Sequence, residues 1–400
     1  MMQRRTLLAA SAAMLAAPRI GAAVTVGVTA TELKIGNFMP YSGPASAYGV
    51  IGRGDAAYFK MINDQGGVGG RQINFITYDD GYSPPRAVEQ TRRLVEQDRV
   101  ALLFHTLGTP SNSAIVRYVN QRRVPHLFLA TGADKWGNYQ DTPWTIGWQP
   151  SYRTEAQIYA KWMLEQKPNA KVALLYQNDD FGKDYVTGVK DVLGARFDQM
   201  VTTASYEVTD PTIDSQVVSL RGTGADVLVT AATPKFAAQT IRKVHDIGWQ
   251  PMHFLSNVSI SIAAVMRPAG PERGVGIITS AYQKDITDPV WNDDRHMQAW
   301  REFMRKYLPE ADMSDSGYAT AYNVSFTLMQ VLRQCEGDFS RENIMRQVAN
   351  IHDLEVPLLL PGIKVSTSPT NFHPIRQMQL QKWSGAHWER FGDVIQGADV

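Results

Sequence analysis

Cysteine is almost absent from this 400-residue chain, and neither sign of charge is in excess. Cys335 is the only cysteine, so no disulfide can form within the chain. It ends the apolar face of an expected helix, where a place in the core is a more common role than reactivity. Lys and Arg together number 40, against 39 Asp and Glu. This balance gives no reason to expect binding to nucleic acid or to an anionic membrane surface.

The usual signatures of catalysis and of metal binding are also absent. The chain contains no G-x-S-x-G, no H-E-x-x-H and no Walker-type phosphate loop. Its eight histidines are scattered without the spacing of metal ligands. Asp79 and Asp80 follow an expected strand, where adjacent side chains point in opposite directions, so they make no shared acid–base site. We expect no enzymatic activity, no cofactor and no metal; a secreted hydrolase is the weaker alternative.

Residues 1–23 are typical of a cleaved export signal. Arg4 and Arg5 precede an apolar run over 7–17, and small residues at 21–23 suit a signal peptidase. The run is far shorter than the roughly 20 apolar residues that a membrane-spanning helix needs. A buried N-terminal helix is the less favoured alternative. The paired arginines also resemble a twin-arginine signal, although they suit the ordinary route as well. With no cysteine near the cleavage site, we expect a soluble periplasmic protein without membrane insertion.

Short apolar runs alternate with amphipathic helices along the rest of the chain. Most of these runs lack a polar–apolar alternation, as is typical of buried parallel strands. Strands are expected at 34–39, 72–78, 100–104, 125–130, 171–176, 201–207, 226–232, 253–255 and 275–280. The alternation predicts an α/β fold with parallel sheets that carry helices on both faces. About 375 residues remain after the signal, which is more than one core usually supports, so two lobes are expected.

The most specific pattern lies between Lys34 and Asp98. It comprises PxSG at Pro40, Ser42 and Gly43, INxxGGVxG at 62–70, YDD at 78–80, Pro84, and LVEQD at 94–98. In this order, the pattern resembles the type I periplasmic solute-binding proteins of ABC importers, in particular the Leu/Ile/Val-binding protein family. The resemblance continues through almost all of the chain after the signal.

The resemblance implies two Rossmann-like lobes, each a mostly parallel sheet flanked by helices, joined by a hinge of three crossings. We place the crossings near Trp148, Tyr282 and Leu360. Lobe 1 is then expected to comprise 24–148 and 283–358, and lobe 2 to comprise 149–282 and 359–400. The family's function would be to capture a small ligand between the lobes and deliver it, as a monomer, to a membrane permease. A sensor of the same fold that acts in signalling or gene regulation is the alternative.

Lobe 1 offers three loops between a strand and a helix, and in the resembling family the second and third loops hold the ligand's carboxylate. Hydroxyl and backbone N–H groups at a helix start favour an anion. The candidates by position are Tyr41 and Ser42 in the first loop, Gly108 and Thr109 in the second, and Ala130, Thr131 and Gly132 in the third. Plain capping is the alternative for Thr109. A helix is expected over 112–122, with Ser111 as its cap.

Lobe 2 offers Phe181, Thr233, Asn257 and, at the second crossing, Tyr282. Phe181 stands where the family often has a tyrosine across the ligand; a place in the core is the alternative. Asn257 lies where amino-acid receptors of the family usually present a carboxylate to the ligand's ammonium group. A buried ammonium without an anion is costly, and Trp136 near the third loop, with Phe181 and Tyr282, could stack on a ring. We therefore expect an aromatic or hydrophobic acid first and a branched-chain amino acid next. Asp179 or Asp180 could still supply the missing charge.

Overall fold

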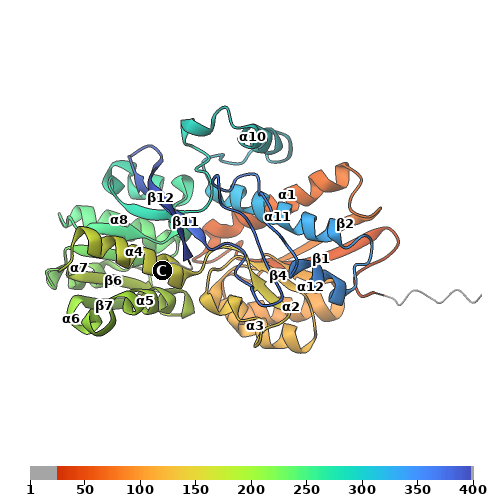
Figure 1. Ribbon diagram of the computed structural model, residues 1–400, viewed down its shortest axis with the longest axis horizontal. Helices are drawn as coiled ribbons and strands as arrows, with labels where there is room; N and C mark the ends of the chain where they lie inside the picture. Colours follow the sequence, from red (N-terminus) through yellow and green to blue (C-terminus); the bar gives the residue numbers. More distant parts are fainter. Residues whose placement is uncertain (1–24, 398–400) are drawn as a thin grey trace, which may run out of the picture.

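The computed structural model describes residues 25–397, and it shows an α/β protein built on two separate sheets (Figure 1). The expected export signal lies outside the described residues. The two sheets follow one another along the longest axis of the molecule, each with its own helices. We call the part built on the five-stranded sheet lobe 1, and the part built on the seven-stranded sheet lobe 2.

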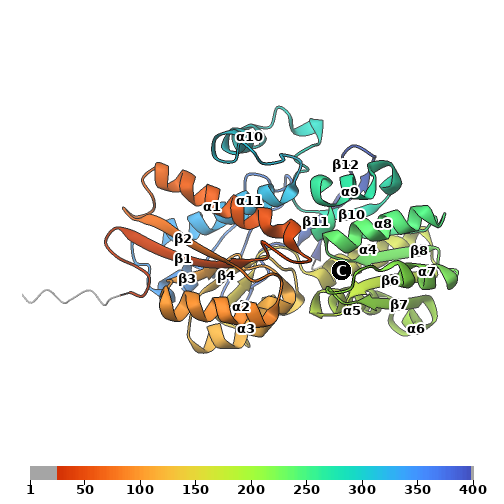
Figure 2. The ribbon, with the colours of Figure 1, turned by 180° about the vertical axis from the view of Figure 1, so that it is seen from behind.

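Lobe 1 contains a sheet of five parallel strands in the order β2-β1-β3-β4-β5. The strands are β1 (Glu32–Met39), β2 (Gln72–Asp79), β3 (Leu102–Phe104), β4 (His126–Leu129) and β5 (Thr145–Gly147). The helices are α1 (Gly49–Asp64), α2 (Pro84–Arg92), α3 (Thr109–Gln121), α10 (Arg295–Tyr307), α11 (Ser316–Gln334) and α12 (Arg341–Val348). Helices α1 and α11 pack together on one side of the sheet, and α2 and α3 pack on the other (Figures 1 and 2). Every residue of β3 and β4 is buried, as expected of central parallel strands.

Lobe 2 contains a mixed sheet in the order β12-β11-β10-β9-β8-β6-β7. Strands β6 (Val172–Gln177), β7 (Val201–Tyr206), β8 (Val227–Ala231), β9 (Met252–Leu255) and β10 (Ile278–Ala281) are parallel. Strands β11 (Gln377–Trp383) and β12 (Trp388–Gln396) add an antiparallel hairpin at one edge. The helices are α4 (Tyr152–Gln166), α5 (Asp180–Leu193), α6 (Phe197–Met200), α7 (Asp214–Gly222), α8 (Pro234–Asp246) and α9 (Arg267–Ala269).

The chain passes between the two sheets three times: after β5, after β10 and before β11. Two of these passages lie side by side, because Gln283 and Leu359 form an antiparallel bridge. The backbone N–H of Leu360 donates to the carbonyl oxygen of Tyr282 at 2.9 Å. The expected architecture of two Rossmann-like lobes joined by three crossings is therefore confirmed. The residue bounds assigned to each lobe from the sequence stay a prediction.

Strand β5 and the hairpin of β11 and β12 were not expected from the sequence. Strand β5 has only three residues, and β11 alternates buried apolar residues with polar ones, so neither matches the continuous apolar runs of the other strands. Cys335 lies at the end of α11 with 3% of its surface exposed. Burial raises the pKa of its thiol to about 12, which agrees with the expected place in the core.

Candidate functional site

A cavity of about 120 Å³ lies between the two lobes. Residues of lobe 1, of lobe 2 and of the passages between them all contribute to its wall. A cavity of roughly 150 Å³ is known to hold a molecule as large as benzene, so this space is on the scale of one small ligand. The wall includes Tyr48, Tyr82, Gly108, Thr109, Ala130, Gln149, Tyr152, Phe181, Thr233, Asn257, Ser261, Ser280, Tyr282, Lys284, Asp285, Asp315 and Trp388.

Seven of the eleven candidate residues line this cavity. They are Gly108, Thr109, Ala130, Phe181, Thr233, Asn257 and Tyr282. Helix α3 begins at Thr109 rather than at residue 112, so the expected start of this helix is wrong. Ser111 consequently lies inside the first turn, and its hydroxyl donates to Asp80 at 2.6 Å instead of capping the helix. The second loop therefore meets the cavity at the N-terminus of α3.

The other four candidates lie away from the wall of the cavity. The Tyr41 hydroxyl is hydrogen-bonded to Thr77 at 2.8 Å, and the Ser42 hydroxyl donates to Asp79 at 2.5 Å. Gly132 lies against the passage between the lobes, where an added Cβ would approach the carbonyl oxygen of residue 150 at 2.5 Å. Thr131 lies directly behind Thr109 and contacts it.

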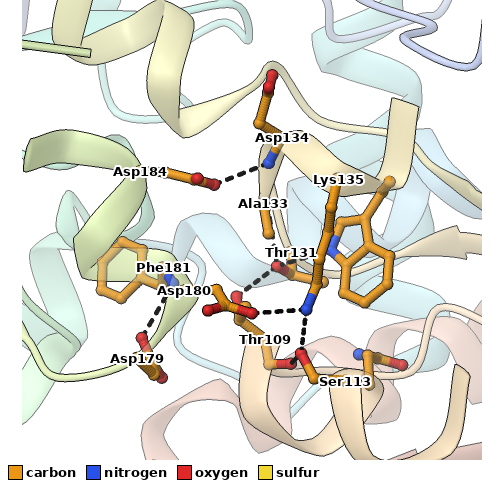
Figure 3. Close-up of polar contacts among 12 residues, drawn as sticks. Thr109, Ser113, Thr131, Ala133, Asp134, Lys135, Asp179, Asp180, Phe181 and Asp184 are labelled. Carbon is orange, nitrogen blue, oxygen red and sulfur yellow. Dashed lines mark hydrogen bonds and ion pairs between the residues drawn. The ribbon is translucent and has the colours of Figure 1, made fainter. Parts of the chain in front are cut away.

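Thr109 and Thr131 form a pair of hydroxyl groups beside the cavity. Their hydroxyl oxygens lie 2.6 Å apart, and either can be the donor (Figure 3). Thr131 Oγ1 also accepts the backbone N–H of Ala133 and the indole N–H of Trp136, each at 3.3 Å. When Thr131 donates to Thr109, the Thr109 proton is available to a ligand in the cavity. The first turn of α3 adds the backbone N–H groups of Thr109 and Ser111, whereas Pro110 has none. Trp136 has a structural role here and does not line the cavity.

Aromatic rings make up much of the remaining wall. Tyr152 and Phe181 lie with ring centroids 4.8 Å apart at 63°, which is an edge-to-face arrangement. Tyr282 packs in the same way against Trp148, with centroids 5.9 Å apart. Tyr82 follows the YDD motif with φ at 59°, a conformation that is strained for a tyrosine. Such rings suit a flat or hydrophobic ligand.

Several of these wall residues were missed by the sequence analysis. Tyr48, Tyr82, Gln149 and Tyr152 lie in turns or at helix ends that carry no specific motif. The only available signal was for Tyr82, which directly follows Asp80 and a glycine in the resembling region.

The charged side chains in the wall already have partners within the protein. Lys284 pairs with Asp294 at 2.8 Å. Asp285 accepts the backbone N–H of Trp388 at 2.8 Å. Asp315 accepts the N–H of Gly317 at 3.1 Å and the hydroxyl of Ser261 at 3.0 Å, and burial raises the pKa of this carboxyl. Recognition of an acidic ligand group would therefore depend on hydroxyl and backbone N–H donors.

Asp179 and Asp180 do not line the cavity. Asp179 caps α5, where its carboxylate accepts the N–H groups of Phe181 at 3.0 Å and Gly182 at 3.4 Å. Asp180 pairs with Lys135 at 2.6 Å. Both carboxylates are thus engaged elsewhere. Asn257, by contrast, is in the wall, and its backbone N–H donates to the buried carboxylate of Glu155 at 3.1 Å.

Polar contacts join the two lobes beside the cavity. Lys135 of lobe 1 contacts Asp180 of lobe 2, and the backbone N–H of Asp134 donates to Asp184 at 2.8 Å (Figure 3). We call these four residues the interlobe latch. Burial is the main cause that raises the pKa of Asp184, to about 7.

Further contacts between the lobes lie outside the interlobe latch. The Tyr48 hydroxyl donates to the carbonyl oxygen of Val258 at 3.1 Å. Arg267 pairs with Asp312 at 2.6 Å. The Tyr48–Val258 and Arg267–Asp312 contacts thus also join lobe 1 to lobe 2.

Within residues 25–397, no group of three or more His, Cys, Asp or Glu side chains is arranged to hold a metal ion. Over the same residues, no helix combines the length and the apolar character that crossing a membrane requires.

Comparison with known proteins gives consistent matches over most of the chain. Residues 32–387 match the family described as periplasmic binding protein. Leu/Ile/Val-binding protein homolog 7 of Brucella abortus is 24% identical over 370 residues, which cover 88% of this chain and 89% of that protein.

Two solved structures share the fold at low sequence identity. One is a branched chain amino acid ABC transporter from Thermus thermophilus with bound valine, with a TM-score of 0.80 and 14% identity over 93% of this chain and 97% of that one. The other is an ABC transporter solute binding protein from R. palustris in complex with benzoate, with a TM-score of 0.76 and 20% identity over 91% of this chain and 98% of that one.

Proposed function

The chain belongs to the periplasmic binding protein family, and we propose that it is the substrate-binding component of an ABC importer. Its ligand would be a small carboxylate with an aromatic or hydrophobic body, with a branched-chain amino acid as the next choice. The observation that carries this proposal is the cavity between the lobes, where the N-terminus of α3 and the Thr109 hydroxyl meet a wall of aromatic rings.

The acidic end of the ligand would bind at the start of α3. A helix N-terminus presents unpaired N–H groups and the positive end of the helix dipole, so it favours an anion. Thr109 adds a hydroxyl donor at the same place. Because Lys284 is already paired with Asp294, these neutral donors are the groups best suited to a carboxylate.

The body of the ligand would pack among the rings of Tyr82, Tyr152, Phe181 and Tyr282. Burying a ring or a branched aliphatic side chain contributes roughly 1.5 to 3 kcal/mol. The benzoate in the R. palustris protein and the valine in the T. thermophilus protein are both compatible with such a wall. These two ligands are bound by those proteins and are not assigned to this chain.

Transport would follow from closure of the lobes. A ligand that touches both lobes shifts the population towards the closed form, by no more than its differential affinity for that form. The closed protein, a monomer without catalytic activity, would then dock on a membrane permease in the periplasm after removal of residues 1–23, by the ordinary or the twin-arginine route. A sensor of the same fold is the alternative, and uptake by vesicles that contain the permease would separate the two.

A thermal-shift titration tests the ligand class. Benzoate, 3-phenylpropanoate, 4-methylpentanoate, valine and leucine would each be added to the protein without its first 23 residues. A true ligand raises the melting temperature in proportion to the logarithm of its concentration, and the corresponding amides serve as controls without the acid group. Stabilisation by the amides but by none of the acids would contradict the proposal. Stabilisation by valine and leucine alone would place amino acids ahead of aromatic acids.

A further inference from the structure

A buried carboxylate without a cationic partner lies behind the lobe 2 wall of the cavity. Glu155 on α4 has none of its surface exposed. Among residues 25–397, it takes part in no ion pair. Its carboxyl group instead accepts hydrogen bonds from the hydroxyls of Tyr159, Tyr185 and Ser280, the last at 2.6 Å, and from the backbone N–H of Asn257 at 3.1 Å. Two of these four donors, Ser280 and Asn257, belong to residues that line the cavity.

The Glu155 carboxyl group acts as an acceptor towards both wall residues. Burial is the largest influence on this group and raises the pKa of Glu155, although the hydrogen bonds from Ser280, Tyr159, Tyr185 and Asn257 act in the opposite direction. The Ser280 hydroxyl and the backbone N–H of Asn257 both donate to Oε1, whereas Tyr185 contacts Oε2. Oε1 therefore accepts these two hydrogen bonds whether or not Oε2 carries a proton.

The network determines which atoms Ser280 and Asn257 offer to the cavity. The single proton of the Ser280 hydroxyl is donated to Glu155, so Ser280 Oγ is left as an acceptor. The side-chain amide of Asn257 donates to this oxygen at 3.4 Å, which leaves the amide oxygen of Asn257 as a second acceptor. Behind both lies the buried carboxyl group of Glu155, with which no cation in the described part of the chain pairs. A ligand group with a positive or partly positive hydrogen stabilises this arrangement, because the low dielectric of the interior strengthens the attraction.

We propose that Glu155 makes the wall of Ser280 and Asn257 a hydrogen-bond acceptor, which selects carboxylates that carry a hydroxyl or ammonium donor away from their acid group. This inference rests on the proposed function. Thr109 is the donor of lobe 1, and the Ser280–Asn257 wall is the acceptor of lobe 2, so one ligand with both groups joins the two lobes. Glu155 is a positioning residue, because it acts on the ligand through Ser280 and Asn257.

The arrangement also changes what the neutral side chain of Asn257 implies about the ligand. Taken alone, an asparagine at this position disfavours an ammonium group. With the Glu155 carboxyl group directly behind it, the same wall presents acceptor oxygens, so an amino acid is again compatible with the site.

Three pairs of acids test the proposal: 3-phenylpropanoate with phenylalanine, 4-methylpentanoate with leucine, and benzoate with 4-hydroxybenzoate. Dissociation constants would be measured by isothermal titration calorimetry at pH 7. We expect the donor-bearing member of at least one pair to bind about tenfold more tightly, since a buried acceptor without a donor is costly. The first two pairs examine an ammonium donor and the third a hydroxyl donor.

Two variants separate this role from a structural one. Glu155→Gln replaces one acceptor oxygen with an NH2 donor, and it should reduce the preference for the donor-bearing member about tenfold while the acid-only member keeps its affinity. Asn257→Ala keeps the backbone N–H that Glu155 needs, so it tests the wall even if Glu155→Gln does not fold; the same loss of preference is expected. Equal weakening of both members of a pair would indicate a structural role and overturn the inference.

The outcomes also separate this inference from the proposed function. If acids bind but no pair shows a preference for the donor, only the inference is wrong. If none of the six acids binds, the proposed function is wrong and the inference is overturned with it.

Discussion

At the residue scale, the hydroxyl groups of Thr109 and Ser280 on opposite walls of the cavity have opposite hydrogen-bonding roles. Thr109 can give its hydroxyl proton to a ligand, because Thr131 can donate to Thr109 in turn. Glu155 takes the proton of Ser280 away from the cavity. One wall therefore donates and the other accepts. This polarity follows from residues behind the wall, which a ligand does not touch.

Thr109→Ala should weaken binding of a carboxylate ligand by roughly tenfold or more, since a hydrogen bond to a charged group contributes about 1.5 to 3 kcal/mol. Stability without ligand should change little, because Thr109 caps nothing and makes one side-chain hydrogen bond, to Thr131. Calorimetric titration and thermal melting of the same samples measure both effects. Thr109→Ser keeps the hydroxyl and is the matched control. Intact affinity together with a large fall in melting temperature would assign Thr109 a structural role.

At the scale of elements, the interlobe latch connects the loop after β4 with the start of α5. Lys135 contacts both Ser113 and Asp180 at 2.6 Å, and Asp184 accepts the backbone N–H of Asp134 (Figure 3). The contacts with Asp180 and Asp184 cross from one lobe to the other, so they exist only when the lobes are close together, whereas the contact with Ser113 lies within lobe 1. Changes in the interlobe latch should therefore affect ligand affinity more than the stability of either lobe.

Lys135→Met should reduce ligand affinity by a factor of about 1.4 to 5, because an exposed ion pair contributes roughly 0.2 to 1 kcal/mol. The melting temperature without ligand should stay nearly unchanged. Lys167→Met is the matched control, since Lys167 pairs with Asp226 at 3.1 Å within lobe 2. Calorimetric titration of both variants measures the difference. If the control loses as much affinity as Lys135→Met, the effect does not come from the contact between the lobes.

Ligand affinity should rise as the pH falls from 8 to 6. In the closed form, burial raises the pKa of Asp184 from 3.8 to about 7. Opening returns the carboxyl group to water and lowers its pKa again, so closure takes up a proton between these two values. The protonated form therefore favours closure below about pH 7, and this contribution is lost as the pH rises through 7. The hydrogen bond from the Asp134 backbone N–H and the charge of Lys135 lower this pKa, and the charges of Asp134 and Asp180 raise it further.

Calorimetric titrations from pH 6 to 8 measure this effect, which has an upper limit of about tenfold per pH unit for one proton. Asp184→Asn keeps an acceptor for the Asp134 N–H and cannot titrate, so its affinity should depend less on pH. An affinity that rises with pH, or an equal slope in Asp184→Asn, would contradict this role of Asp184.

At the scale of the whole molecule, the three passages between the sheets determine how the lobes can move. Two of them, the passage after β10 and the passage before β11, are joined by the bridge of Gln283 and Leu359. A change of the angle between the lobes therefore moves these two passages together. The ligand cavity lies at the same place, since Tyr282 and Gln283 line it. In the proposed function, ligand binding and closure of the lobes would therefore involve the same residues.

Small-angle X-ray scattering should show a smaller radius of gyration when a ligand from the acid screen is present. The physical reason is that a ligand with contacts to both lobes favours the closed form in proportion to those contacts. An acid that does not raise the melting temperature is the control. Identical scattering profiles with and without a tightly bound ligand would contradict closure on binding.

The sequence by itself determined most of the strands and the loops at their ends. The nine expected strands all occur, within a few residues of their expected bounds, because short apolar runs between turn residues are a local signal. Gly108, Thr109 and Ala130 were expected at the ligand site from the resemblance, which implies that the second and third loops of lobe 1 hold the ligand's carboxylate. The carboxyl ends of parallel strands meet at one edge of a sheet, so loops that follow these strands lie together.

Only the tertiary structure decided which groups lie next to one another in and behind the wall of the cavity. Asn257 and Glu155 lie 102 positions apart in the chain, and no local pattern predicts that the carboxylate is buried behind the amide. The contact of Lys135 with Asp180 and the rings of Tyr48 and Tyr152 in the wall likewise depend on how the two lobes pack. Burial and long-range hydrogen bonding arise from contacts between distant segments, whereas helix and strand periodicity is written in neighbouring residues.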